Sequence, residues 1–148
     1  AANKRGFKSE VMVNTTEPLF LDGVRNENKK VVLSTVHQQF VEGIAQANIP
    51  LSYKDVELEH IEQWLSQGFS VLLLISTYSF DGKKSPHWVC VTHLDEHCVY
   101  VHDPFCEPGS DKQLAIDCQY VPIERSDFSK MSAFGSQRLR TAVAIANN

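Results

Sequence analysis

Two neighbouring segments carry residues that can perform acid–base chemistry. His87 opens the run HWVCVTH (residues 87–93), and Asp103 ends the run CVYVHD (residues 98–103). A carboxylate bonded to an imidazole holds the ring in one tautomer and stabilises its charged form, so that the other ring nitrogen can act as a base or an acid. This chemistry requires a fold that brings the two side chains together.

The two runs are predicted to be the strands of a β-hairpin around residues 94–97. With Asp95 at the centre of an odd-length loop, two valine pairs face each other on one core-facing side, Val91 with Val99 and Val89 with Val101. An even-length loop would mix these valines with polar residues, because a shift of one residue moves every side chain to the other face. The valine pattern therefore favours the odd-length loop.

In this register the next pair outward is His87 opposite Asp103, with Cβ atoms about 4.5–5.5 Å apart. Pro86 and Pro104 flank the pair and predict that both strands end there, at the margin of the sheet. The same residues also fit a purely structural His–Asp pair at a sheet edge.

The other elements follow from hydrophobic spacing and from residues that start or stop them. Strands are predicted over residues 9–13, 51–53, 71–76, 118–123 and 139–145. A helix is predicted over residues 26–47, a second one capped by Asp55 and stopped by Gly68, and a short one capped by Ser126. The order predicts an α+β fold, a mainly antiparallel sheet flanked by helices, with residues 1–148 in a single domain.

Composition excludes several classes of protein. Hydrophobic residues make up 43% of the 148 residues, which is enough for a packed core. The net charge of −4 gives no basic surface for nucleic acid. No apolar run approaches the roughly 20 residues that span a bilayer. The four cysteines contain no Cys-x-x-Cys pair, so no metal and no cofactor is expected. Cys90 and Cys98 lie in apolar strand patterns, where free cysteine is usually a small core residue, so a reducing, cytoplasmic setting is the simpler expectation.

The two motifs, residues 86–92 (PHWVCVT) and 99–104 (VYVHDP), resemble the His and Asp motifs of papain-like cysteine peptidases. They are most similar to the bacteriocin-processing, double-glycine leader peptidases and their stand-alone bacterial relatives. The likeness continues through residues 18–23 and 121–123. It implies a papain-like fold, a peptide or protein substrate, His87 as general base and Asp103 as its orienting partner.

The chain departs from that family at the nucleophile. The family's cysteine opens a helix near the start of the domain, after a glutamine, and no cysteine or glutamine precedes Gln38 here. Residues 1–6 (AANKRG) read as the last turn of a helix, or alternatively as a frayed terminus. We therefore expect the nucleophile upstream of residue 1 and this chain to be the C-terminal portion of a peptidase domain, inactive alone.

The cysteines of the chain are poor substitutes for that nucleophile. Cys90 and Cys98 are predicted to face away from His87, Cys118 is distant in the sequence, and Cys106 would have to fold back. Losing a helix would also expose apolar surface, which predicts self-association.

Two other functions remain open at this stage. One is a non-catalytic relative that binds peptides or partners, and the other is a zinc protein that uses the histidines of the hairpin. Among these, His93, His97 and His102 do not converge in the predicted register.

Overall fold

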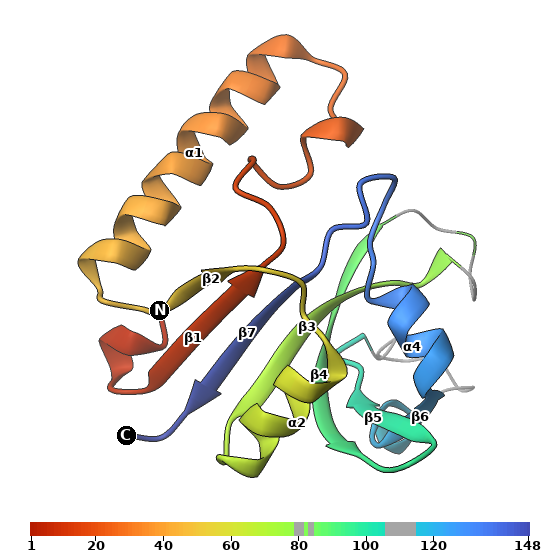
Figure 1. The fold of residues 1–148 in the computed structure, drawn as a ribbon. Coiled ribbons are helices and arrows are strands. Elements are labelled where there is room, and N and C mark those ends of the chain that lie inside the picture. Colours follow the sequence, from red (N-terminus) through yellow and green to blue (C-terminus); the bar gives the residue numbers. More distant parts are fainter. Residues whose placement is uncertain (79–81, 83–84, 106–114) are drawn as a thin grey trace.

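The computed structural model describes residues 1–78, 82, 85–105 and 115–148. In this part of the chain a seven-stranded sheet has the order β2-β1-β7-β3-β4-β5-β6 (Figure 1). The strands are β1 (Lys8–Val13), β2 (Leu51–Tyr53), β3 (Ser70–Ser76), β4 (Pro86–Leu94), β5 (Cys98–His102), β6 (Val121–Glu124) and β7 (Thr141–Ala146). Only β1 and β2 pair in parallel, so the predicted α+β class with a mainly antiparallel sheet is confirmed.

Helices α2 (Leu58–Ser66) and α4 (Arg125–Met131) cover one face of the sheet. The main core lies beneath them and joins Ile61 and Trp64 of α2 and Phe128 and Met131 of α4 to the strands. Strand residues in this core include Val71, Leu73, Ile75, Val89, Val91, Val99, Val101, Ala142 and Ala144. A smaller cluster of Val13, Leu74 and Leu139 packs with Trp88 on the other face.

The four valines of the hairpin share one face as predicted, but the predicted register is wrong. The structure pairs Val91 with Val101 and Leu94 with Val99. A β-bulge at Thr92 lies between these two parts of the ladder. Without the bulge, the register next to the turn would send Val89 and Val91 to the face opposite Val99. The extra residue restores the common face.

The turn of the hairpin explains this register. The Asp95 carboxylate accepts hydrogen bonds from the backbone N–H groups of His97 (2.8 Å) and Cys98 (2.7 Å) and from the Tyr100 hydroxyl (2.7 Å). Arg125 bonds the Asp95 carbonyl and also pairs with Glu62, which ties the turn to α2. Asp95 is therefore the first residue of a three-residue loop, whereas we expected it at the centre.

Two predicted helix caps are wrong, and one predicted strand is shorter. Glu57 caps α2 in a reciprocal bond pair with His60, while Asp55 is bonded elsewhere. Glu124 caps α4 by accepting from the Ser126 N–H, so Ser126 lies inside the helix. A 3₁₀ turn, Ala115–Cys118, occupies the start of the strand predicted over residues 118–123. Glutamate is a less common cap than Asp or Ser, which explains why the sequence pattern favours Asp55 and Ser126.

The N-terminal region contains one long helix and two short turns. Asn3–Arg5 forms a 3₁₀ turn that ends at Gly6 in the left-handed conformation, and Leu21–Gly23 forms another. Helix α1 (Glu27–Gln46) begins at the cap Asn26 but buries none of its residues. Its Phe40 side chain is 68% exposed. In Figure 1 the helix lies to the upper left of the sheet, on the side of β2. No helix of the described residues is long and apolar enough to cross a membrane.

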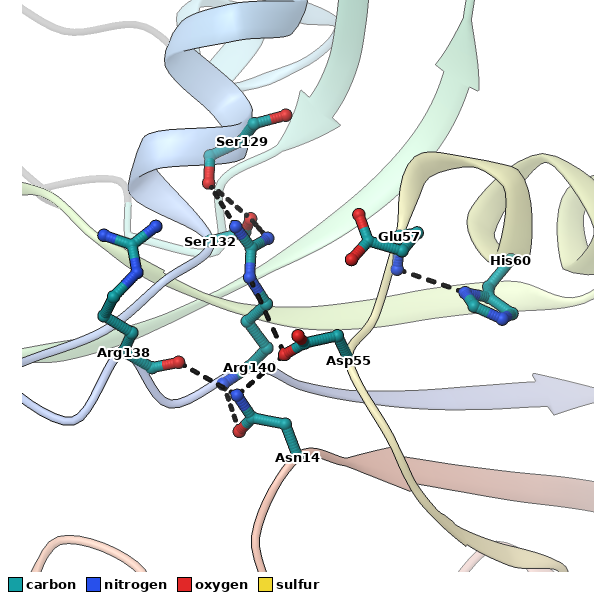
Figure 2. Close-up of polar contacts among 8 residues, drawn as sticks. All are labelled: Asn14, Asp55, Glu57, His60, Ser129, Ser132, Arg138 and Arg140. Atoms are coloured by element: carbon teal, nitrogen blue, oxygen red, sulfur yellow. Dashed lines mark hydrogen bonds and ion pairs between the residues drawn. The ribbon is translucent and has the colours of Figure 1, made fainter.

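A polar network closes one end of the sheet (Figure 2). The guanidinium of Arg140 donates to the Ser132 hydroxyl (2.8 Å) and the Ser129 carbonyl (3.0 Å) of α4 and lies 4.0 Å from the Asp55 carboxylate. Asn14, which follows β1, donates to Asp55 (2.8 Å) and accepts from the backbone N–H of Arg140 (2.8 Å). The network joins β1, β7, α4 and the β2–α2 connection.

We expect Arg140→Lys to lower the free energy of unfolding by about 1–2 kcal/mol, because an ammonium group cannot reproduce the divergent donors of the guanidinium. Urea denaturation measures the change. Arg138→Lys is the matched control, because the Arg138 guanidinium has no partner among the described residues (Figure 2), and its effect should stay within about 0.5 kcal/mol. Equal losses in the two variants would contradict the role assigned to Arg140.

The turn at Asp95 should give a pH-dependent contribution to stability. The Tyr100 hydroxyl and the N–H groups of Cys98 and His97 lower the pKa of Asp95 to about 2. Because the folded pKa is depressed, the stabilisation is complete above the unfolded pKa of roughly 3.9 and is lost as the pH falls toward 2.

Asp95→Asn should therefore be less stable than the parent between pH 5 and pH 7, with a difference that narrows below about pH 4. Urea melts across this pH range measure it. Glu96→Gln removes the neighbouring carboxylate of the same turn and serves as the control. A parent–variant difference that does not change with pH would contradict the assignment.

Candidate active site

The structure brings His87 and Asp103 together at the margin of the sheet. The His87 Nε2 atom lies 2.8 Å from the Asp103 Oδ1 atom, and the side chains are 21% and 32% exposed. His87 is the second residue of β4, at the end far from the hairpin turn and opposite Ile75 of β3, and Asp103 directly follows β5. The pair is therefore half-buried, and its proximity was correctly predicted.

The two residues meet across a diagonal, not as directly opposed residues. Cys90 pairs with His102, so the same register continued by one residue sets Asp103 beside Val89. His87 is then two residues further along β4 on the same face. Diagonal neighbours have Cα atoms about 7–8 Å apart, which an imidazole can bridge. The error of two residues in the register kept both side chains on one face because the side-chain period is two.

Two hydrogen bonds with backbone groups position Asp103. The N–H of Phe105 donates to the same Oδ1 atom that bonds His87, at 2.8 Å. The N–H of Asp103 itself donates to the carbonyl of Cys118, also at 2.8 Å. No local pattern predicts the second contact, because it depends on how the segment before β6 returns to the sheet. The first is the bond that an aspartate commonly makes two residues ahead in a turn.

This arrangement assigns the proton on the imidazole. An ionised carboxylate only accepts hydrogen bonds, so Nε2 carries the shared hydrogen and Nδ1 carries the lone pair in the neutral ring. No described residue forms a hydrogen bond with Nδ1. A half-buried imidazole oriented in this way can take a proton from a neighbouring group and return it to another.

The cysteines that the structure describes do not supply a thiol to this pair. Cys90 is opposite His102 on the face of the sheet that points away from His87, and burial raises the pKa of its thiol. Cys98 lies at the far end of β5, opposite Glu124. Cys118 is disulfide-bonded. The orientation predicted for Cys90 and Cys98 is confirmed, and Cys106 lies outside the described residues.

The other histidines of the hairpin do not form a metal site in the described part of the chain, where no group of three or more His, Cys, Asp or Glu side chains is placed to hold an ion. His93 packs against Tyr100, and His102 packs edge-on against Tyr120. The Nε2 atom of His102 is buried and has no hydrogen-bond partner among the described residues. The zinc interpretation therefore has no support from the geometry.

Comparison with known proteins adds one relationship. No curated protein and no solved structure matches the chain. Residues 1–146 match a protein family described as the Peptidase_C39 like family. The match spans both strands of the hairpin and both members of the His–Asp pair. This α+β chain, with a half-buried imidazole held by a carboxylate at the margin of its sheet, belongs to the Peptidase_C39-like family.

Proposed function

We propose that His87 and Asp103 are the general base and the orienting carboxylate of a cysteine peptidase. The observation that carries the proposal is the 2.8 Å contact between His87 Nε2 and Asp103 Oδ1, which leaves Nδ1 as the proton acceptor. The family relationship supports a peptide substrate. The proposal assigns the substrate to the class that double-glycine leader peptidases cleave, because the two motifs resemble those of that group.

The nucleophile in this proposal is a cysteine that precedes residue 1. Its thiol gives a proton to Nδ1 of His87, and the thiolate attacks the carbonyl carbon of the scissile bond. The imidazolium then protonates the leaving amine, and an acyl-enzyme remains. Water, deprotonated by the same imidazole, releases the acid and restores the thiol.

The carboxylate of Asp103 has two roles in this cycle. It keeps the Nε2–H tautomer, so that Nδ1 faces the thiol with its lone pair, and it stabilises the imidazolium that forms twice. Because Phe105 and the Cys118 carbonyl hold Asp103 through backbone groups, the carboxylate need not reorganise when the ring becomes charged.

Thiol labelling with a peptide-like electrophile tests the proposal. We expect the full-length parent protein to be labelled at one cysteine and the 148-residue chain not to be labelled at a comparable rate. In the parent, His87→Ala and Asp103→Asn should each slow labelling on the order of 10²–10⁴-fold, because the thiol loses its base or the base loses its tautomer.

His93→Ala is the matched control, because His93 lies on the same strand and its ring packs against that of Tyr100. It should leave the labelling rate unchanged. Labelling that does not depend on His87 would overturn the assignment of the base. A parent that binds peptides but is not labelled would identify a non-catalytic relative.

Self-association stays a prediction, and α1 is the surface on which it now depends. The helix exposes Val31, Val32 and Phe40 to solvent. We expect the 148-residue chain to sediment faster than a monomer at high concentration, and Phe40→Ser to shift it toward the monomer. The exposed aromatic variant Tyr53→Ser, on β2, is the control. An unsubstituted 148-residue chain that is monomeric at every concentration would contradict the prediction.

A further inference from the structure

A three-residue turn, Asp103–Pro104–Phe105, sets the position of the Asp103 carboxylate. The side chain of Asp103 folds back to accept from the Phe105 N–H, while the same oxygen bonds His87. Pro104 is the residue between the donor and the acceptor. Its ring fixes φ near −65°, and it also restricts the residue before it to an extended backbone.

The side chains of Pro104 and Phe105 do not belong to the hydrophobic core of the described residues. Pro104 and Phe105 are both exposed, and the Phe105 ring is 62% accessible to solvent. Among the described residues, the other contacts of Asp103 are the imidazole of His87 and the backbone carbonyl of Cys118. Cys118 lies close to the turn, with its Sγ atom 3.7 Å from the carbonyl oxygen of Phe105. Within the turn itself, the backbone restricts Oδ1 to a position that faces His87.

We infer that Pro104 is a positioning residue, which orders the Asp103 carboxylate before His87 has to accept a proton. The inference rests on the function proposed for the pair. Pro104 acts through the conformational freedom of the backbone, since its ring fixes one dihedral angle that any other residue would leave free. A proline that fits the native backbone typically changes the ratio of ordered to disordered conformations by a factor of roughly two to five. Replacing Pro104 should raise the population of the open turn by that factor.

The exchange of the His87 Nε2–H proton with water tests this in the 148-residue chain. NMR at low temperature detects this proton while the carboxylate holds it. We expect roughly two- to five-fold faster exchange in Pro104→Ala and a larger increase in Pro104→Gly, because glycine leaves the turn least restricted. Asp103→Asn, which removes the anionic acceptor, should give the fastest exchange of the series.

Pro50→Ala is the control for a general loss of stability, because Pro50 is an exposed proline at β2, remote from the His–Asp pair. It should leave the exchange rate unchanged. Exchange that is equal in the parent, Pro104→Ala and Pro104→Gly, with faster exchange in Asp103→Asn, would overturn the role of Pro104 and leave the pair intact. Absence of the proton signal in the unsubstituted 148-residue chain would overturn both the role of Pro104 and the hydrogen bond between His87 and Asp103. Failure of the full-length protein to react with the electrophile would remove only the proposed function.

Discussion

The alternation of side chains along β4 and β5 is the constraint on which the site depends. His87, Val89 and Val91 project to one face of the sheet, and Val101 projects to the same face from the neighbouring strand. Burial of the valines beneath α2 and α4 fixes that face, because the opposite choice would expose apolar side chains and bury polar ones. His87 and Asp103 are the polar residues at the end of this apolar row. Their contact is therefore a consequence of core packing.

Face and register are separate properties of a strand pair, and the sequence carries much more information about the first. The spacing of the valines determines which side chains share a face, and this part of the prediction is correct. Register is set by how the turn closes and by the bulge at Thr92, which depend on the three hydrogen bonds of Asp95. A register error of two residues leaves every face unchanged, so the His–Asp pair could be found from a register that was wrong. The backbone support of Asp103 by Phe105 and Cys118 is tertiary, and local patterns do not encode it.

The sequence predicts where the helices lie along the chain better than it predicts whether the apolar face of each helix is buried. The 3.6-residue spacing located α1 and α2 to within a few residues, since both have a start signal and an apolar stripe. The stripe of α2 is buried, with Ile61 and Trp64 in the core, whereas the stripe of α1 is not. The same periodic pattern thus occurs in one helix with buried residues and in one without any. Periodicity reports which face could pack, and only the tertiary structure reports whether a partner is present.

Among the residues that the structure describes, Asp103 is the ionic partner of His87 at the end of the sheet. Continuing the β3–β7 register by two residues sets Arg140 in line with Ile75, which itself lies opposite His87. Arg140 directs its guanidinium to α4 and Asp55, and Ile75, only 2% exposed, separates it from the imidazole. Ile75 is an apolar neighbour of the imidazole, and low local polarity strengthens the hydrogen bond between the imidazole and the carboxylate. Ile75 therefore separates the Arg140 network, which stabilises the fold, from the His–Asp pair, for which we propose proton transfer.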